Sequence, residues 1–277
     1  MDIDVVELHS RLLNMAKSFH KFCQENGLNY YILGGTCLGA RRHKGFIPWD
    51  DDMDIGMPRK DYEKLIELQT SLPYYLELRY YENTPNSPMH FIKLIDNRST
   101  LIEPRYNDYV EGLYIDIFPL DSAKNGYKNW FERLRWCRIW YLQGLIIYHR
   151  MTEEPTSLLK KVVKSYARKL NFDLLHNKLE KAMTRNRDEN SAYIANFLGA
   201  WQIKEIVPRE VMGTPKLYRF EDIQLYGPEQ IDRYLKHLYG DYMALPKEED
   251  RVFKHAYIML DFNLPYREFL EKYKMNF

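Results

Sequence analysis

The residues best suited to chemistry lie between Gly34 and Arg59, where a Gly-Gly-Thr turn, a basic cluster and four carboxylates follow one another. Four negative charges within five positions repel one another unless a cation neutralises them. Basic side chains of this number and type suit phosphate oxygens. The segment therefore predicts a site for a metal ion and a phosphate group. Its acids are Asp50, Asp51, Asp52 and Asp54, and its basic residues are Arg41, Arg42, His43 and Lys44.

The acids must be positioned by a strand. From residue 52 to 57, Asp52, Asp54 and a glycine alternate with apolar side chains, the period-two pattern of a strand with one acidic face. Asp52 and Asp54 therefore point the same way. Asp50 joins them if the strand extends that far, whereas Asp51 faces the other side and is the poorest ligand candidate of the four.

The glycine turn connects two predicted elements. Residues 30–33 are β-rich and lead into Gly34, Gly35 and Thr36, after which residues 37–43 can form a short helix whose N-terminus faces the turn. Glycine lets the backbone approach a phosphate without an intervening Cβ atom. Strand, turn and helix together predict a phosphate-binding turn.

A further acid stands in the apolar strand predicted over residues 112–118. Asp116 lies there between two isoleucines, and a lone carboxylate in a central strand is costly unless it is paired or bound to a metal. We therefore predict Asp116 as the third ligand, beside Asp52 and Asp54. Such a set suits one or two Mg²⁺ ions, with Mn²⁺ as the alternative, because hard cations prefer carboxylate oxygens.

The whole chain of 277 residues, 45% hydrophobic, predicts an α+β protein. We expect a mixed sheet of five or six strands flanked by helices in residues 1–120, an added helical region in 121–190, and a C-terminal region in 191–277 that packs back on the core. Further strands are predicted over 75–81, 90–96, 100–103 and 193–197, a hairpin over 220–226, and helices over 5–26, 130–150, 158–170, 172–187 and 229–238.

Composition narrows the class of protein. No secretory signal or apolar run of membrane-spanning length is evident, which predicts a cytoplasmic protein, and nothing indicates a nucleic-acid partner. The cysteines, Cys23, Cys37 and Cys137, form no C-x-x-C pair, so we expect reduced thiols and neither a disulfide framework nor a zinc site.

Charge is segregated along the chain. Residues 128–187 contain fourteen Lys and Arg against five Asp and Glu, and they also carry Trp130, Phe131, Trp136, Trp140 and Tyr141. This mixture fits contact with an anionic membrane surface at the inner face of the membrane, or with an anionic glycan. The alternative interpretation is a packed amphipathic helix with a solvated basic face.

The segment GGTCLGARRHKGFIPWDDDMDIGMPRKDYEKL resembles the signature of the LicD family, which includes bacterial phosphocholine transferases and is related to fukutin-related proteins. The resemblance continues through HFIKLIDNRST, GLYIDIFPLD and RFEDIQLYGPEQIDRYLKHLYGDYMALPKEEDR. It covers most of the chain outside residues 120–190. Seventeen positions separate Gly35 from Asp52, a longer gap than is usual in the wider superfamily.

The resemblance implies a nucleotidyltransferase-like fold used for phosphotransfer. A CDP-alcohol, CDP-choline above all, would donate its phospho-alcohol to a hydroxyl of a cell-surface glycan precursor, for example in teichoic acid or lipopolysaccharide modification, and release CMP. The acceptor would be lipid-linked if the enzyme works at a membrane. By this resemblance the metal ligands are Asp52, Asp54 and Asp116, the donor phosphates lie against Gly34, Gly35 and Thr36, and Arg41, His43 and Lys44 contact phosphate or nucleotide.

Several residues keep two interpretations. Lys93 could reach the site from its strand or be a surface lysine with an exposed amine. Trp49 could stack on the base or be structural. Glu248, Glu249, Arg251 and His255 lie in the family-like tail, which a solvated loop explains almost as well. As general base we prefer Asp116, which must already face the metal, over Asp50, His255 and His90.

Two other functions stay open. One is nucleotidyl transfer to a small alcohol or sugar phosphate, and the other is a catalytically inactive module that binds nucleotide or glycan. Retention of three mutually repelling acids argues against the inactive module. The alcohol itself stays open among choline, ribitol, glycerol and ethanolamine, because their donors share the CDP half.

Overall fold

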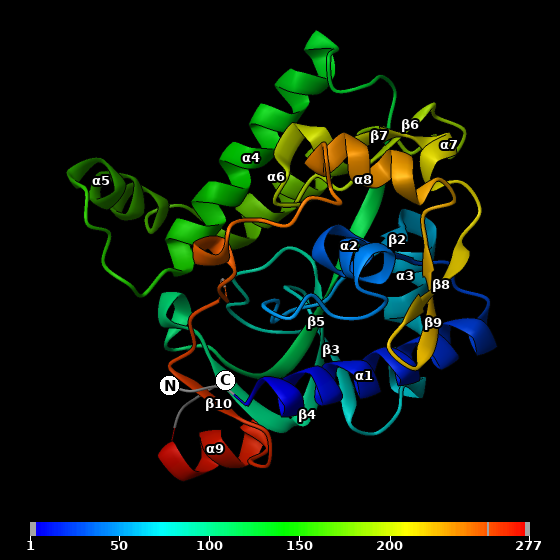
Figure 1. Cartoon of the computed structure of the whole chain (residues 1–277). Helices are drawn as coiled ribbons and strands as arrows, with labels where there is room; N and C mark the ends of the chain where they lie inside the picture. Colours follow the sequence, from blue (N-terminus) through cyan, green and yellow to red (C-terminus); the bar gives the residue numbers. More distant parts are fainter. Residues whose placement is uncertain (1–3, 254, 275–277) are drawn as a thin grey trace.

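The computed structural model describes residues 4–253 and 255–274 of the chain, and these form an α+β fold around a curled mixed sheet (Figure 1). The main path of this sheet runs β1-β2-β5-β4-β10, with β3 added beside β4, β6 beside β5, and β7 beside β6. The predicted α+β class is confirmed. The strands of the sheet are β1 (Tyr31–Ile32), β2 (Asp54–Pro58), β3 (Leu76–Arg79), β4 (Ile92–Ile102), β5 (Val110–Ala123), β6 (Tyr193–Ala195), β7 (Ile206–Pro208) and β10 (Met259–Asp261).

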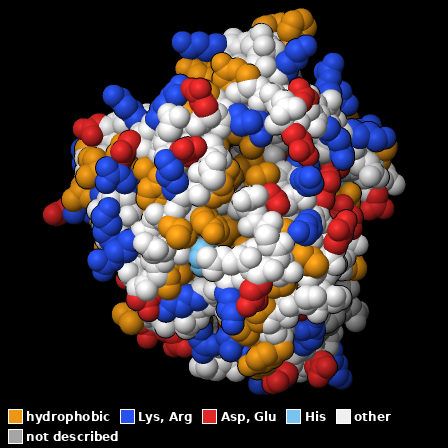
Figure 2. Space-filling model, turned by 90° about the vertical axis from the view of Figure 1, so that its right-hand side faces the viewer, with side chains coloured by type: hydrophobic (Ala, Val, Ile, Leu, Met, Phe, Trp, Pro, Cys, Tyr) orange, Lys and Arg blue, Asp and Glu red, His pale blue; other side chains and the backbone are white. Residues whose placement is uncertain are grey.

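Helices and a separate hairpin surround the sheet. The hairpin joins β8 (Lys216–Phe220) to β9 (Ile223–Gly227). The face on the side of β8 mixes basic and acidic side chains around a hollow in which hydrophobic side chains show (Figure 2). The helices are α1 (Val5–Asn26), α2 (Gly34–Arg42), α3 (Arg59–Glu67), α4 (Trp130–Arg150), α5 (Leu158–Ala167), α6 (Phe172–Met183), α7 (Arg209–Met212), α8 (Ile231–Tyr239) and α9 (Tyr266–Tyr273).

α1 shows how local sequence sets an element. Asp4 accepts hydrogen bonds from the backbone N–H groups of Val6 and Glu7, both at 3.1 Å, and so caps the first turn. Gly27 ends the helix in the left-handed conformation, with φ of 61°. The apolar stripe between these caps, which includes Leu8, is buried and packs against β5.

The register of three strands places the predicted acids. β2 runs parallel to β5 with Asp54 opposite Asp116, and β4 runs antiparallel to β5 with Lys93 opposite Asp116. Residues directly opposite each other on neighbouring strands share one face of a sheet. Lys93, Asp116 and Asp54 therefore form a row across the centre of the sheet.

Several predicted boundaries are wrong. The acidic strand begins at Asp54, so residues 50–52 lie before it and strand parity does not apply to them. The short helix begins at Gly34, so the predicted glycine turn is its first turn. Strands expected over 90–96 and 100–103 form one strand, β4, with a register shift between Asp96 and Leu101. The sheet has eight strands in the described residues, where five or six were expected.

We call α4, α5 and α6 the helical arm. A buried polar junction ties it to the sheet: Arg59 of α3 donates to both oxygens of Asp121 on β5, at 2.8 and 2.7 Å, and lies 3.2 Å from Glu180 of α6. His90 contacts Glu180 at 3.0 Å and His176 at 2.8 Å. The arm and the sheet are thus joined by charge-assisted contacts.

The C-terminal region contributes to the same sheet, because β6 pairs with β5 and β10 pairs with β4. β7, β10, α7 and α9 were not expected from the sequence. The division at residues 120 and 190 stays a prediction. None of the helices in the described part of the chain has the length and apolar character that crossing a bilayer requires.

Candidate functional site

The glycine-rich start of α2 lies against the acidic strand. The backbone N–H of Asp54 donates to Thr36 Oγ1 at 2.8 Å, and the N–H of Leu33 donates to the carbonyl oxygen of Asp54 at 2.9 Å. Gly34 has φ of +47°, and a Cβ atom added there would lie 3.0 Å from Asp54 Oδ2. The first turn of α2 and the carboxylate of Asp54 are therefore in direct contact.

Gly35 makes a second close approach, to Asp50. A Cβ atom at Gly35 would lie 2.6 Å from Asp50 Oδ2, a separation that real side chains do not tolerate without movement. The two glycines thus leave room for two carboxylates at the N-terminus of α2, where backbone N–H groups favour negative charge. The turn predicted to face phosphate already faces acids.

Asp116 has an unusual environment for a carboxylate. Its Oδ1 atom is buried and has no hydrogen-bond partner among the described residues. Burial and the charge of Asp52 raise its pKa to about 7, against the opposing effect of Lys93. A buried carboxylate oxygen without a donor is an atom that a cation would satisfy.

Asp54 is perturbed in the same direction. Burial raises its pKa well above the usual range, and the charges of Asp52, Asp116 and Asp50 raise it further. Mutual repulsion of this kind indicates that the acids lie close enough to share one counter-charge. Together with the orphaned oxygen of Asp116, it means that these residues fit a divalent cation such as Mg²⁺.

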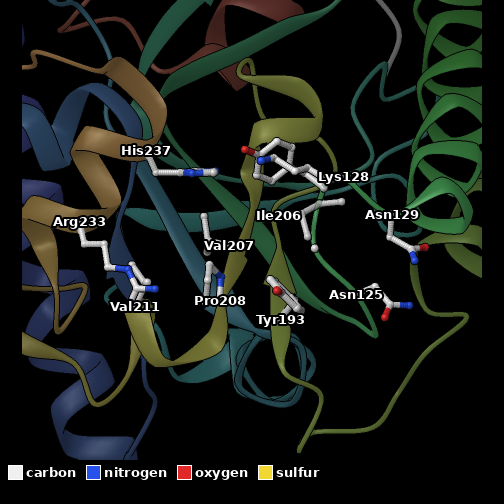
Figure 3. A pocket seen from close by; sticks show the side chains of 12 residues that line it. Asn125, Lys128, Asn129, Tyr193, Ile206, Val207, Pro208, Val211, Arg233 and His237 are labelled. Atoms are coloured by element: carbon white, nitrogen blue, oxygen red, sulfur yellow. The ribbon is translucent and has the colours of Figure 1, made fainter.

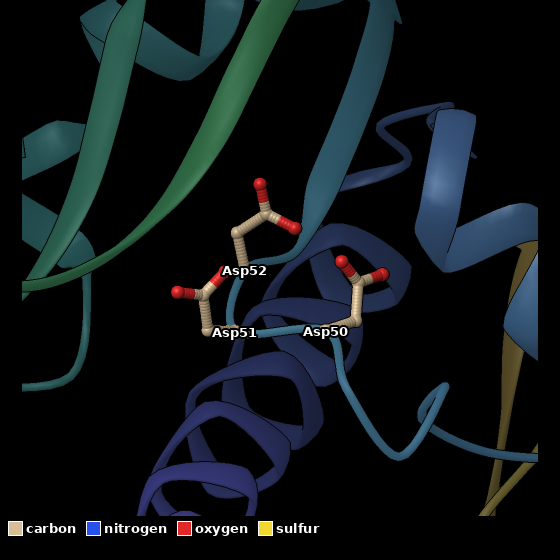
Figure 4. Close-up of side chains that lie close together, drawn as sticks. All are labelled: Asp50, Asp51 and Asp52. Atoms are coloured by element: carbon tan, nitrogen blue, oxygen red, sulfur yellow. The ribbon is translucent and has the colours of Figure 1, made fainter. Parts of the chain in front are cut away.

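The segment before β2 adds a second grouping of acids. One carboxylate oxygen from each of Asp50, Asp51 and Asp52 lies within 4.8 Å of the others, a spacing at which they could hold a metal ion. Figure 4 shows the three side chains spread along one short segment, with Asp52 pointing toward the ends of the strands. The ligand roles of Asp52, Asp54 and Asp116 stay a prediction, as does the exclusion of Asp51.

Asp51 is buried and bound by the C-terminal tail. Its carboxylate accepts hydrogen bonds from the backbone N–H of His255 at 3.3 Å and the hydroxyl of Tyr257 at 3.3 Å, and its Oδ1 lies 2.9 Å from His255 Nδ1. His255 also lies 3.8 Å from Asp52. The hydrogen bond to Asp51 raises the pKa of His255 to about 9, so this ring carries positive charge beside the acids at neutral pH.

Lys93 is not the exposed lysine that one interpretation allowed. Its side chain is buried, its Nζ lies 2.7 Å from Glu111 and 3.7 Å from Glu103, and the same atom lies 3.3 Å from the ring centre of Tyr114. These acids raise the pKa of Lys93. The lysine is therefore a buried cation next to Asp116, held by Glu111.

The predicted phosphate-binding basic residues have protein partners. Arg41 pairs with Asp232 of α8 at 2.7 Å, and Arg42 donates to the carbonyl oxygens of Tyr242 and Ala244. The exposed Lys44 donates to the carbonyl oxygen of Arg41 at 3.1 Å. These contacts order the basic cluster against the C-terminal region, and its predicted role in phosphate binding stays a prediction.

The remaining candidates are dispersed around this cluster. The ring of His43 meets Trp49 edge to face at 6.0 Å, and the guanidinium of Arg251 lies 5.3 Å from the ring centre of Trp49. Trp49 thus contacts two side chains of the protein, and its stacking on the base stays a prediction. Glu248 is exposed in a short 3₁₀ helix, η4 (Glu248–Asp250).

Sequence reasoning missed several neighbours of the acids. The hydroxyl of Tyr234 accepts from the N–H of Gly34 at 3.4 Å, and a Cβ atom at Gly34 would lie 3.8 Å from the hydroxyl of Tyr239. Tyr257 contacts Asp51, and Glu111 contacts Lys93. Residue type alone could not single out the three tyrosines near the acids, because the chain contains 23 tyrosines. Glu111 carried a signal, because it is a second acid in the strand of Asp116.

A cavity of about 420 Å³ lies on another side of α8 (Figure 3). Lys128, Arg233 and His237 contribute to its wall together with Tyr127 and Tyr193, and the acids described above do not. Arg233 is paired with Glu210 at 2.6 Å. α8 thus presents Tyr234 to the glycine turn and Arg233 and His237 to this cavity.

Residues 27–143 match the family described as LicD/FKTN/FKRP, nucleotidyltransferase domain. The chain is 28% identical over 255 residues to the lipopolysaccharide cholinephosphotransferase LicD of Haemophilus influenzae, an alignment that covers 89% of this chain and 95% of that protein. It is 32% identical over 125 residues to mannosyltransferase regulator 4 of Saccharomyces cerevisiae, covering 43% of this chain and 10% of that protein.

A shorter match, 49% identical over 35 residues, links the chain to the human ribitol 5-phosphate transferase FKRP and covers 13% of this chain and 7% of that protein. The matched domain contains the glycine turn, the acidic strand and Asp116, whereas most of the helical arm lies beyond it. The chain thus contains a domain of the LicD/FKTN/FKRP type and is similar to LicD along most of its length.

Proposed function

We propose that this protein is a phosphotransferase that moves a phospho-alcohol from a CDP-alcohol to a hydroxyl group of a glycan and releases CMP. The main support is the pairing of Asp54 with Asp116 on neighbouring parallel strands, beside the glycine turn of α2. Carboxylates next to a helix N-terminus suit a substrate whose phosphates bring their own cation. Phosphocholine is the proposed group, because the relative that aligns over most of the chain is named a cholinephosphotransferase.

The proposed metal ligands are Asp52, Asp54 and Asp116, whose mutual repulsion and orphaned oxygen fit Mg²⁺. When bound, such an ion would neutralise phosphate charge and make the CMP group a better leaving group. The donor phosphates are proposed to bind near the start of α2, whose backbone N–H groups favour negative charge, beside the carboxylates that lie against Gly34 and Gly35. No covalent link to the protein is needed, because the acceptor oxygen can attack phosphorus in line with the bond to CMP.

The acceptor hydroxyl must lose a proton as the new oxygen–phosphorus bond forms and the bond to CMP breaks. Asp116 is the proposed base, since its Oδ1 atom has no hydrogen-bond partner among the described residues and its carboxylate lies in the proposed metal site. His255 is a poorer base, because its pairing with Asp51 favours the protonated ring. His90 is engaged by Glu180 and His176 in the junction.

The donor is tested by incubating the protein with a panel of CDP-alcohols carrying choline, ribitol, glycerol or ethanolamine, together with Mg²⁺ and an acceptor glycan. We expect CMP release with one donor, choline above all, and attachment of its phospho-alcohol to the glycan. Attachment of the nucleoside monophosphate itself would instead establish nucleotidyl transfer. Absence of turnover with every donor and acceptor glycan would contradict the proposed reaction.

Metal removal gives a separate expectation. Treatment with EDTA should abolish CMP release, and added Mg²⁺ or Mn²⁺ should restore it, whereas Ca²⁺ should restore less because it takes more ligands at longer distances. Thermal unfolding gives a second measure, since a cation that binds the acids of the folded state raises the melting temperature. Full turnover in EDTA would contradict the metal site.

The predicted cytoplasmic location stays a prediction.

Gly35→Ala should lower turnover by about 100-fold, because the new methyl group would displace Asp50 and shift the reacting groups by a fraction of an ångström or more. Steady-state CMP release at saturating donor measures the effect. The matched control is Gly144→Ala within α4, where an added Cβ meets no atom within 4 Å. That change should keep turnover and stabilise the helix by about 0.5–1 kcal/mol. Equal turnover in both variants would contradict the role of Gly35.

A further inference from the structure

α5 packs on the protein through Lys164, Ala167 and the half-buried Val163. Its buried residues are Lys164 and Ala167, whereas Leu158, Leu159, Val162 and Tyr166 are 78%, 74%, 59% and 52% exposed. We call these four residues the α5 face. They recur at helical spacing, so one side of the helix carries an apolar stripe that no other described part of the chain covers.

This orientation is held by specific contacts. Lys164 Nζ lies 2.6 Å from Glu154 and donates to the carbonyl oxygens of Glu153 and Thr152, at 2.9 and 3.4 Å. The loop before α5 therefore anchors the lysine inside. Because the buried side of the helix is fixed by a paired charge, the opposite, apolar side must face outward.

The apolar surface continues onto α4. Tyr166 of α5 lies close to Tyr141 of α4, and Leu134 and Trp130 share the side of α4 on which Tyr141 lies, because the three recur at helical spacing. All three α4 residues are about half exposed or more. Figure 1 shows α5 at the outer edge of the molecule, away from the sheet. The packed-helix interpretation of this segment is therefore wrong for these side chains.

Four exposed positive charges lie on or next to α5, and the nearest acids along the chain are Glu153 and Glu154 before it and Asp173 after it. Residues 155–172 include Lys160, Lys161, Arg168 and Lys169, all exposed, and contain no Asp or Glu. Exposed aliphatic and aromatic side chains flanked by lysine and arginine match the two layers of an anionic lipid surface, in which acyl chains lie beneath negative headgroups. We propose that the α5 face, with the adjoining side of α4, binds the surface of an anionic membrane.

Two other occupants fit less well. A second copy of the chain docked face to face would place these cations against their own counterparts, which repel. A nucleic acid would satisfy the charges but would leave the leucine and valine side chains without apolar contact. Lipid satisfies both kinds of group at once. Because vesicle binding needs neither donor nor acceptor, it is measured independently of the proposed transfer reaction.

The experiment is cosedimentation of the full chain with phosphatidylcholine vesicles, with and without phosphatidylglycerol. We expect binding to the anionic vesicles only, and loss of binding as salt rises from about 0.1 M to about 1 M. Leu159→Glu with Val162→Glu should weaken the partition coefficient at least about tenfold by removing apolar burial and adding negative charge. Lys161→Gln with Lys169→Gln should weaken it about tenfold through charge alone.

Matched controls lie elsewhere on the surface. Val6→Glu with Leu217→Glu changes two exposed apolar residues, and Lys21→Gln with Lys272→Gln changes two exposed lysines. Both control variants should bind like the wild type. Circular dichroism and thermal unfolding establish that each variant is folded, which the exposed positions favour.

Three outcomes would overturn the assignment. Absence of binding to anionic vesicles excludes lipid, and equal losses in the α5 and control variants exclude this face. A dimer in sedimentation velocity that Leu159→Glu with Val162→Glu converts to a monomer, without vesicle binding, assigns the face to a second copy of the chain.

Discussion

Asp54→Asn and Asp116→Asn should each reduce CMP release by about 1000-fold or more while the protein stays folded. Each change keeps the shape of the side chain but removes a charge that the proposed cation requires. The two residues are opposite each other on β2 and β5, so both are expected to act on the same ion. Steady-state assays at saturating Mg²⁺ and donor measure the loss.

Stability should change in the opposite direction. In EDTA, removal of one negative charge from the repelling group should leave the melting temperature unchanged or raise it, because Asp54 and Asp116 destabilise each other without a cation. Asp222→Asn is the control, since Asp222 is exposed and pairs with Lys17 on the surface at 2.6 Å. It should alter neither property. Retained turnover in folded Asp54→Asn protein would refute the site.

Lys93→Met should lower the free energy of unfolding by about 3–5 kcal/mol, the usual cost of removing one partner of a buried ion pair. Methionine replaces most of the volume but leaves Glu111 buried without its cation. The change also removes the charge that opposes the raised pKa of Asp116, so turnover should fall as well. Urea denaturation followed by circular dichroism measures the free energy of unfolding.

A double variant separates charge from packing. Lys93→Met with Glu111→Gln removes both charges, so most of the lost stability should return. Lys21→Met, at an exposed lysine of α1, is the control and should change stability by less than about 0.5 kcal/mol. A double variant as unstable as Lys93→Met alone would show that the pair matters through packing and not through charge.

The acidic strand and Asp116 could be predicted because their signals are local. Alternation of Asp54 with apolar residues identifies a strand and its polar face, and a single acid inside an apolar run identifies a buried carboxylate that needs a partner. The parallel pairing that places these two residues opposite each other follows from the fold that the resemblance implied.

The partners of the basic residues could not be predicted in this way. Arg41 pairs with Asp232, 191 positions later in the chain, and Asp51 binds His255, 204 positions later. Nothing in the spacing of either segment reports such contacts. Lys93 shows the same limit over a shorter distance, because alternation with apolar neighbours is the same for a buried, paired lysine and an exposed one.

An amphipathic pattern also does not determine which side of a helix faces the protein. The spacing of Leu158, Leu159 and Val162 predicts a helix with an apolar side, and burial of that side is the usual outcome. Here Lys164 is inside and the apolar side is outside, because the preceding loop supplies the oxygens that bind its amine. The local sequence determines that this helix forms, whereas the preceding loop determines which side of the helix faces the protein.

β5 carries Asp116 near its middle and Asp121 near its end, about 17 Å further along if the chain rises about 3.3 Å per residue. Asp121 is the point at which Arg59 and Glu180 fasten the helical arm. If the helical arm lies on a bilayer as proposed, this rigid connection would keep Asp116, and the metal site proposed around it, at a constant distance from the lipid surface.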